Sequence, residues 1–426
     1  MRRRFLMPCA LALAAGLAAL TAATTARGAE TNTLSVVGPW TGADEQSFRA
    51  VLDDFQQQNP TLTVTYAAAP DGVASTIGAA AASSSGTKHD VAVLSLPSEL
   101  EQLQAMARAG TLEPIEFAVP AFRTAFASSW KRLGSVDGKL FALPVKATNR
   151  SAFWFDQRLL RSQGLAAPAS WKALLRVSDA LAGKGVTPFA VGGASAIALP
   201  GLFQNVYLML QGNQRYDQLM RGAIPWTDAT VRDSLRLMRG SLVQPNRIAG
   251  GLDSLRSPFT GAVQKVFGTP VKSAMVIGGS DVIPVLQSAK AVRPLTQFGV
   301  FPFPTADGKG PPRVIGDAQV AVMLEDTPAA RAFVSYLATG QAGSIWAKRD
   351  VAFLSPNRKV DLRSYPAAVR PLATALTHAT VFRFGIADAA TPEFKATFNR
   401  LLAEYVRNPA RVSQITAQLQ AAATRA

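Results

Sequence analysis

The chain has 426 residues, of which 48% are hydrophobic and 17% are charged, a composition typical of a globular protein with room for two domains. Its formal charge of +16 raises the question of nucleic-acid binding, but the basic residues are scattered singly and do not gather in long runs. We therefore expect a solvated basic surface and no nucleic-acid partner. The single cysteine, Cys9, lies near the N-terminus, so the rest of the chain can form no disulfide, cysteine metal site or cysteine nucleophile.

Residues 1–28 have the features of an export signal. Three arginines at positions 2–4 precede an apolar run rich in alanine and leucine, and Ala26-Arg27-Gly28 forms a small-residue cleavage site. Pro8 and Gly16 interrupt the run, so a cleaved signal is favoured over a retained membrane anchor. The order Arg-Arg-x-Phe-Leu also fits a twin-arginine signal, which leaves the export route open. We expect a periplasmic protein that is cleaved at the end of this segment.

The first segment after the signal predicts a strand, a helix and a second strand. Leu34–Val37 is a short apolar run that ends at Gly38-Pro39. The helix is predicted by apolar residues at the spacing of one helical face, namely Phe48, Val51, Leu52 and Phe55. Asn59-Pro60 ends this helix, and the alternation of residues 62–66 predicts the next strand.

Trp40 directly follows the first predicted strand, and Asp44 and Glu45 come shortly after it. In open α/β sheets, ligands bind at the carboxyl ends of the strands. An aromatic ring beside carboxylates can stack on a sugar ring and bind its hydroxyl groups. This edge of the predicted sheet is therefore a candidate sugar site.

Helices and strands continue to alternate, which predicts a parallel α/β sheet. The expected elements up to residue 155 are a helix at 73–82, a strand at 91–94, a helix at 98–108, a hairpin with Asp137-Gly138 at its turn, and a strand-rich segment at 140–155. Residues 156–290 are expected to be mostly helical, and Ser170 is a good N-cap for a helix. The later expectations are helices at 203–210, 216–220 and 230–242, an apolar strand at 271–277, an extended segment at 298–304, a strand at 320–324 and one helix at 329–347.

The chain contains few of the residues that enzyme sites use. His89 and His378 are its only histidines and lie far apart in the sequence. It has no H-E-x-x-H zinc motif, EF-hand loop, Walker loop or G-x-S-x-G elbow. We therefore predict no metal, no cofactor and no catalysis. A glycoside-acting enzyme that uses Asp44, Glu45 and Asp281 is the enzymatic alternative.

Nine short motifs follow one another behind the export signal. They are G-x-W-x-x-x-x-E at 38–45, F-x-x-x-N-P-x-x-x-V at 55–64, HDVAVL at 89–94, DGKLFALP at 137–144, FWFDQRLL at 153–160, GLAAPASW at 164–171, AMVIGGS at 274–280, FPFP at 301–304 and LSPN at 354–357. In this order they resemble the extracellular solute-binding proteins of ABC transporters, in the carbohydrate group that includes maltose-, glucose- and glycerol-phosphate-binding proteins. The resemblance covers nearly the whole chain after the signal.

The resemblance implies a two-lobed α/β protein with the type II periplasmic-binding-protein fold and a ligand cleft between the lobes. The lobes would be joined by hinge crossovers near residues 144–151, 301–303 and 353–356. The expected bounds are a signal peptide at 1–28, lobe 1 at 29–147 plus 303–352, and lobe 2 at 148–302 plus 353–426.

The resemblance also implies ligand contacts. Trp40 corresponds to the residue that stacks on the sugar, and Glu45 to a polar contact that also suits a helix N-terminus. The remaining candidates are Ser95 and Ser98 after the third strand, Lys146, Thr148 and Asn149 on the first crossover, and Ser195, Gln204, Ser280 and Asp281 in the second lobe. Many relatives have tryptophan where this chain has Asp281, so one aromatic platform is missing. The other tryptophans, namely Trp130, Trp154, Trp171, Trp226 and Trp346, match packing positions.

The resulting prediction is a substrate-binding component of an ABC importer. It would capture a small carbohydrate or polyol as a monomer and deliver it to permease subunits at the inner membrane. The positive charge, Lys146 and the missing aromatic ring leave an anionic solute open, such as a sugar phosphate or glycerol phosphate. A periplasmic sensor accessory is a further alternative, because a ligand-loaded form can equally be presented to a receptor kinase.

Overall fold

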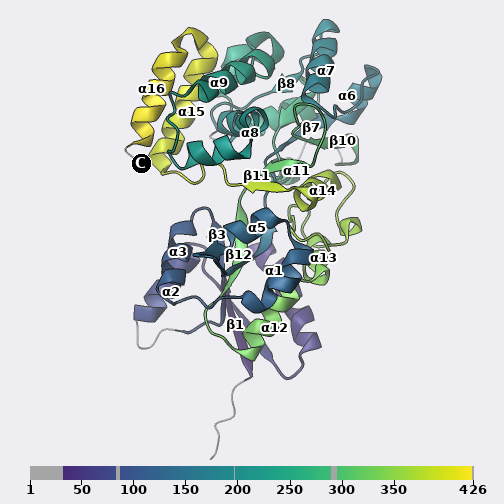
Figure 1. Cartoon of the computed structure of the whole chain (residues 1–426). Helices are drawn as coiled ribbons and strands as arrows, with labels where there is room; N and C mark the ends of the chain where they lie inside the picture. Colours follow the sequence, from purple (N-terminus) through teal and green to yellow (C-terminus); the bar gives the residue numbers. More distant parts are fainter. Residues whose placement is uncertain (1–31, 83–86, 196, 289–294, 425–426) are drawn as a thin grey trace, which may run out of the picture.

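The computed structural model describes residues 32–82, 87–195, 197–288 and 295–424 (Figure 1). The chain forms two lobes, each built around its own β-sheet and covered by helices. This arrangement confirms the α/β class. The predicted export segment, with Cys9, lies outside the described residues.

The first lobe contains a five-stranded sheet in the order β2-β1-β3-β12-β6. Its strands are β1 (Thr33–Gly38), β2 (Thr63–Ala68), β3 (Val91–Leu96), β6 (Ala142–Ala147) and β12 (Ala318–Met323). β1 runs parallel to β2 and β3, whereas β12 is antiparallel to β3 and β6. A strand from far along the sequence therefore lies between β3 and β6, and the sheet is mixed, whereas the sequence predicted a parallel one.

Helices cover both faces of the first sheet. In Figure 1, α2 and α3 lie on one side of it, and α1, α12 and α13 lie on the other. The helices of this lobe are α1 (Gly42–Gln58), α2 (Val73–Ala82), α3 (Leu100–Arg108), α4 (Val119–Ala125), α5 (Ser128–Leu133), α12 (Pro328–Leu337) and α13 (Gly340–Ala347). A small hairpin of β4 (Ser135–Val136) and β5 (Lys139–Leu140) confirms the predicted Asp137-Gly138 turn, with both residues at positive φ.

The second lobe contains a four-stranded sheet in the order β10-β7-β9-β8. Its strands are β7 (Ala152–Asp156), β8 (Phe189–Ala190), β9 (Met275–Ile277) and β10 (Phe298–Pro302). Its helices are α6 (Gln157–Ser162), α7 (Trp171–Gly183), α8 (Ala198–Met220), α9 (Ala229–Ser241), α10 (Phe259–Phe267), α11 (Val282–Ser288), α14 (Arg370–His378), α15 (Pro392–Arg407) and α16 (Val412–Ala423). Along the whole described chain, the short 3-10 helices are η1 (Glu116–Ala118), η2 (Pro245–Arg247), η3 (Gly251–Arg256), η4 (Leu295–Gln297), η5 (Leu362–Ser364) and η6 (Pro409–Arg411).

Segments that run from one lobe to the other lie side by side at the lobe boundary. The first crossover, residues 148–151, connects β6 to β7, and the second, residues 303–317, connects β10 to β12. Thr148 N–H donates to Asp317 O at 2.9 Å, so the two crossovers are hydrogen-bonded. On the second crossover, β11 (Arg313–Ile315) pairs in parallel with β13 (Val381–Arg383), although the predicted bounds assign these strands to different lobes.

One helical segment differs from the predictions. The segments predicted at 203–210 and 216–220 lie in two helices that meet at Gly212, whose φ is 78°, within the element labelled α8. The single helix predicted at 329–347 is two helices, because Thr339 starts a new one: its hydroxyl accepts a hydrogen bond from the N–H of Ala342. Ser170 caps α7 as predicted, since its hydroxyl accepts from the N–H of Ala173.

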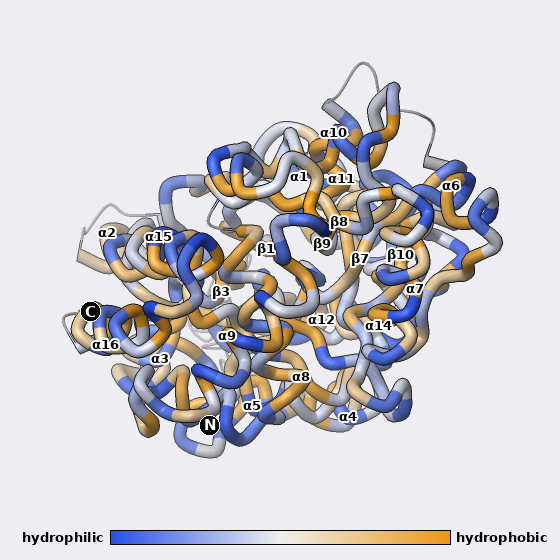
Figure 2. The backbone as a smooth tube through the Cα atoms, turned by 90° about the horizontal axis from the view of Figure 1, so that it is seen from above, coloured by the Kyte–Doolittle hydropathy of each residue, from blue (hydrophilic) through white to orange (hydrophobic). Residues whose placement is uncertain are grey.

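The core of each lobe is formed by the buried faces of amphipathic helices and strands. Hydrophilic and hydrophobic residues alternate along the helices in Figure 2, as expected for helices that bury one face. In α1, for example, Phe48, Val51, Leu52 and Phe55 are buried, as their spacing predicts. The five tryptophans assigned to packing positions, Trp130, Trp154, Trp171, Trp226 and Trp346, are all buried.

Candidate ligand cleft

A cleft of about 890 Å³ lies between the two lobes. The first lobe contributes the start of α1, the end of β6 and the segment after α13, and the second lobe contributes the start of α11 and the turn before it. The lining residues are Thr41, Ala43, Asp44, Ser47, Lys146, Thr148, Ser280, Asp281, Pro284, Gln287, Ala347, Lys348, Arg349, Asp350, Val351, Ala352, Arg363, Ser364, Tyr365 and Pro366.

Lys146 lies on the first-lobe wall, next to the first crossover. Its Nζ donates a hydrogen bond to Asp44 Oδ1 at 2.9 Å and lies 3.5 Å from Asp350 Oδ2. The lysine side chain is only 13% exposed, so the two carboxylates offset the cost of removing its charge from water. The structure thus brings together the predicted Lys146 with Asp44, and adds Asp350.

Asp350 is held in a mostly buried position just after α13. Burial raises the pKa of its carboxyl group, and the nearby Lys146 ammonium opposes this rise. Asp350 Oδ2 has no hydrogen-bond partner among the described residues. This oxygen is buried beside the Lys146 ammonium, and 16% of the Asp350 side chain is exposed where it lines the cleft.

The turn at 278–281 forms part of the second-lobe wall, between β9 and α11. It is fastened to the first crossover by two hydrogen bonds: Asn149 N–H donates to Ser280 Oγ at 3.2 Å, and Ser280 N–H donates to Asn149 O at 2.8 Å. A Cβ atom on Gly279 would lie 1.3 Å from Asn149 O, so this close approach requires glycine. Ser280 and Asp281, both predicted from the sequence, therefore line the cleft.

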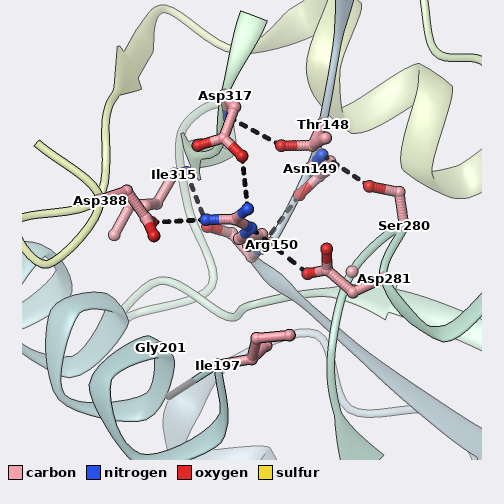
Figure 3. A network of polar contacts seen from close by, with 12 residues as sticks. Thr148, Asn149, Arg150, Ile197, Gly201, Ser280, Asp281, Ile315, Asp317 and Asp388 are labelled. Atoms are coloured by element: carbon pink, nitrogen blue, oxygen red, sulfur yellow. Dashed lines mark hydrogen bonds and ion pairs between the residues drawn. The ribbon is translucent and has the colours of Figure 1, made fainter. Parts of the chain in front are cut away.

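Beside this wall, the guanidinium group of Arg150 contacts three carboxylates, as Figure 3 shows. Its Nη1 donates to Asp388 and its Nη2 to Asp317, while its Nε lies 3.4 Å from Asp281 Oδ2. Lys395 Nζ also contacts Asp388, at 2.9 Å. These five residues form what we call the Arg150 cluster, in which three carboxylates face two cations and give a formal charge of −1.

Burial and the neighbouring charges together set the pKa values in this cluster. Burial raises the pKa of Asp317 to about 6, against the attraction of Arg150. Burial also raises the pKa of Asp281, which lies beside Arg150 and Asp388. For Arg150, burial favours the neutral form, but the three carboxylates outweigh it and raise the pKa of the guanidinium.

The structure places Trp40 in the core of the first lobe, so the exposed stacking platform predicted from the sequence is not present. The side chain is 5% exposed. Its ring lies 4.6 Å from the ring of Phe48 and 4.6 Å from that of Trp346. The physical reason is the turn after β1, where Tyr66 OH donates to Trp40 O at 3.0 Å and accepts from Trp40 N–H at 3.0 Å.

Asn149 and Gln204 are buried residues that hold the backbone, in place of the ligand contacts predicted for them. Asn149 Nδ2 donates to Leu372 O at 3.1 Å, and its Oδ1 accepts from Ser151 N–H at 2.9 Å. Gln204 Oε1 accepts from the N–H of Ile386 at 2.5 Å. Both amides already have protein partners, which leaves them no role in the cleft in this state.

Glu45, Ser95 and Ser195 lie outside the cleft lining. Glu45 pairs with Arg49 one helical turn later, at 2.8 Å. Ser95 N–H donates to a carboxylate oxygen of Glu99 at 2.6 Å, and Ser195 Oγ accepts from a backbone N–H at 3.3 Å. These local contacts are typical of helix surfaces and turns.

Sequence reasoning missed Asp350 and Arg150. Asp350 follows α13 with no motif around it, and its role depends on Lys146, which is distant in the sequence. Arg150 adjoins the candidates Thr148 and Asn149, so its position on a crossover was the one available signal. Neither residue could be paired with its partners until the fold brought them together.

The cleft offers polar groups and little aromatic surface. Among the described lining residues the only aromatic side chain is Tyr365, which is 1% exposed and accepts a hydrogen bond from Ser355 N–H at 3.0 Å. In the described part of the chain, no group of three or more metal-ligating side chains is clustered. No helix within these same residues has the length and apolar character needed to cross a membrane.

Comparison with known proteins identifies related chains of similar length. The alpha-glucosides-binding periplasmic protein AglE of Rhizobium meliloti is 26% identical over 371 residues, which is 84% of this chain and 79% of that protein. The osmoprotective compounds-binding protein GgtB of Synechocystis is 26% identical over 313 residues, or 71% of this chain and 72% of that protein.

Solved structures show the same fold. The bacterial solute receptor AcbH has a TM-score of 0.77 at 17% identity, covering 92% of this chain and 97% of AcbH. RafE from Streptococcus pneumoniae has a TM-score of 0.75 at 18% identity, covering 93% and 99%. The predicted two-lobed fold is thereby confirmed. The family of bacterial extracellular solute-binding proteins matches residues 39–343, and the chain belongs to this family.

Proposed function

We propose that the chain is the substrate-binding component of an ABC importer, which captures a sugar or polyol-like solute between its lobes and delivers it to permease subunits. The observation that carries this proposal is the cleft, whose two walls present the carboxylates of Asp44, Asp350 and Asp281, the Lys146 ammonium and the Ser280 hydroxyl. Carboxylates accept hydrogen bonds from sugar hydroxyl groups, and the ammonium donates to their oxygens.

Recognition in this proposal depends on hydrogen bonds more than on ring stacking. Trp40 and Trp346 are buried in the first lobe, and the ring of Tyr365 is almost fully covered. Closure of the lobes would exclude water from the cleft, which strengthens hydrogen bonds to Asp281 and Asp350. A compact, hydroxyl-rich ligand suits these walls better than a long oligosaccharide, which needs several aromatic platforms.

The relatives support a ligand of this class. AglE is named for alpha-glucosides and GgtB for osmoprotective compounds. AcbH is described as preferring β-D-galactopyranose, and RafE has been solved with raffinose. The compounds named for AglE, AcbH and RafE are different sugars or glucosides, so they support the ligand class, and binding measurements must identify the particular ligand.

A thermal-shift screen tests the proposal. We call galactose, maltose, trehalose, sucrose, raffinose and sorbitol the sugar panel. We expect at least one of them to raise the melting temperature, since a ligand at 100 times its Kd stabilises the folded state by about 2.7 kcal/mol. Calorimetric titration then measures the affinity. If no panel compound shifts the melting temperature or produces binding heat, the proposal is wrong.

An anionic solute is a second candidate, because exposed basic residues lie at the rim of the cleft. Lys348, Arg349 and Arg363 line the cleft and are exposed. Against this candidate, the carboxylates of Asp281 and Asp350 lie deeper and would repel an anion. Glycerol 3-phosphate belongs in the same screen: a shift by this compound alone would favour the anionic ligand.

The proposal includes export, a monomeric state and no covalent chemistry. The relatives are named as binding proteins, which supports a non-catalytic role. Mass spectrometry of the exported protein should find its N-terminus near Gly28, and light scattering should give a monomer. Incubation with maltose or raffinose should release no reducing ends or monosaccharides, whereas sustained turnover would establish an enzyme.

A further inference from the structure

Arg150 lies where the hinge meets the ligand cleft. Its backbone N–H donates to Ile315 O at 2.8 Å, which joins the first crossover to the second. Its guanidinium contacts Asp317, the residue immediately before β12 of the first-lobe sheet, and Asp388, which follows β13. Its Nε is directed toward Asp281, a lining residue of the cleft (Figure 3).

The Arg150 cluster is incompletely satisfied. Arg150 Nε, Asp281 Oδ2 and Asp317 Oδ1 are buried and have no hydrogen-bond partner among the described residues. The contact between Arg150 Nε and Asp281 is 3.4 Å long, whereas the contacts to Asp317 and Asp388 are hydrogen bonds. Oδ2 of Asp281 is thus the buried oxygen that faces the guanidinium, while 18% of the Asp281 side chain is exposed where it lines the cleft.

We propose that Arg150 is a positioning residue that holds the cleft-facing carboxylate of Asp281 in place from the hinge. A ligand hydroxyl that donates to Asp281 then binds a carboxylate whose position depends on the two crossovers. Ligand recognition and the geometry of the hinge are coupled through this one side chain. The role of Asp281 as a ligand contact rests on the proposed function, but the link from Arg150 to the hinge does not.

The planar guanidinium is needed because three carboxylates surround it from different directions. Lysine keeps the charge but offers a single ammonium, so Arg150→Lys cannot serve Asp281, Asp317 and Asp388 at once. The matched control is Arg247→Lys, because Arg247 is also 21% exposed and pairs with one carboxylate, Asp179, at 2.5 Å. Asp281→Asn is the partner variant, since it keeps the side-chain shape and removes the charge.

Hydrogen exchange of the ligand-free protein tests the hinge link. In Arg150→Lys, we expect the backbone amides of residues 146–152 and 278–283 to exchange about tenfold faster than in the wild type, because the loss of one or two buried hydrogen bonds lowers the local opening free energy. Arg247→Lys should leave both segments unchanged. Unchanged exchange in Arg150→Lys would overturn the proposal, whatever the protein binds.

Calorimetric titration with the panel sugar that gives the largest shift tests the link to Asp281. We expect Arg150→Lys and Asp281→Asn each to weaken binding by about fivefold or more, and the double variant to bind no more weakly than the weaker single variant. If Arg150 and Asp281 contributed independently to binding, the two fold-losses in affinity would multiply in the double variant, and that result would overturn the proposal. If no panel sugar binds the wild type, the proposed function fails, and hydrogen exchange alone decides whether Arg150 is linked to the hinge.

Discussion

At the scale of single residues, Lys146 has the most direct consequence for binding, because it contacts Asp44 and Asp350 on the same wall. Replacing it by methionine removes a charge-assisted donor and leaves two carboxylates together. We expect the affinity for the best panel sugar to fall about tenfold or more, since such a bond contributes about 1.5–3 kcal/mol. Calorimetric titration of the Lys146→Met variant measures this loss.

The control is Lys348→Met, which removes an exposed lysine from the rim of the same cleft. It should change sugar affinity less than about twofold, because exposed charges contribute little. Equal losses for the two variants would mean that the affinity depends on the overall charge of the cleft and not on the contacts of Lys146.

The buried position of Trp40 predicts that its replacement lowers the stability of the protein, whereas a stacking role would predict that it lowers the affinity for sugar. Its buried ring packs against Phe48 and Trp346. We expect Trp40→Ala to lower the free energy of unfolding by about 3 kcal/mol or more, as large aromatic truncations in a core do. Urea unfolding measures this, and Trp40→Phe should lose less. Weakened sugar binding by a fully folded Trp40→Ala protein would contradict the core assignment.

The raised pKa of Asp317 predicts how the stability of the folded protein depends on pH. Because burial raises its pKa to about 6 in the folded state, the folded protein binds this proton more tightly than the unfolded chain does. Its contribution to stability is therefore present near pH 4.5 and is lost as the pH rises through about 6. Relative to Asp317→Asn, the wild type should gain about 2 kcal/mol between pH 7 and pH 4.5. Urea unfolding at both pH values measures this difference, and a constant difference would contradict it.

The candidate site was partly predictable from the sequence, for physical reasons. Ser280 ends the AMVIGGS motif, Asp281 directly follows it, and Lys146 comes two residues after DGKLFALP, so their places beside a crossover and on a turn could be predicted. The partners Asp350 and Arg150 could not, because each acts through side chains that only the tertiary fold brings near. Local sequence also cannot tell whether a ring after a strand turns toward the cleft or, like Trp40, into the core.

At the scale of elements, the turn between β9 and α11 depends on Gly279. A Cβ atom there would overlap Asn149 O on the first crossover. We expect Gly279→Ala to move Ser280 and Asp281 away from the crossover, with a loss of both stability and sugar affinity, because the clash involves backbone atoms. Gly240→Ala is the control: it lies in α9 with open space around it, and alanine there should stabilise by about 0.5–1 kcal/mol.

Melting temperature and calorimetric titration together check this prediction. An unchanged melting temperature and affinity for Gly279→Ala would show that the turn can shift freely without affecting the second-lobe wall.

Individual elements were more predictable than their connections. Helix α2 and strand β3 begin where the apolar spacing predicts, and Ser170 caps α7. The break between α12 and α13 was missed, because apolar residues keep a helical spacing across Thr339 while its hydroxyl starts a new helix. The pairing of β11 with β13 joins segments nearly 70 residues apart, and no local pattern indicates such a partner.

At the scale of the whole molecule, the order of the strands links the two lobes. β12 completes the first sheet only after the chain has passed through the second lobe and returned by the second crossover. The first-lobe wall of the cleft comes from α1, β6 and the segment after α13, so it too requires this return. We therefore expect each lobe to move as a packed unit, with bending concentrated in the crossovers that connect the units.

Closure of the lobes on a ligand can be measured with two labels across the cleft. Lys348 follows α13 in the first lobe and Gln287 lies in α11 of the second; both line the cleft and are exposed. The sequence has no cysteine after Cys9, so Lys348→Cys and Gln287→Cys give a pair of unique labelling sites in the exported chain. We expect the distance between the labels, measured by fluorescence energy transfer, to shorten when the best panel sugar is added.

The control pair places both labels in the first lobe, at Lys348→Cys and Gln57→Cys, where Gln57 is an exposed residue of α1. Its distance should not change, because α1 and α13 pack against each other within one unit. If calorimetry shows saturating sugar while the pair across the cleft also keeps its distance, ligand is bound without closure. The crossovers would then serve as fixed links between the lobes, and desolvation on closure could not contribute to affinity.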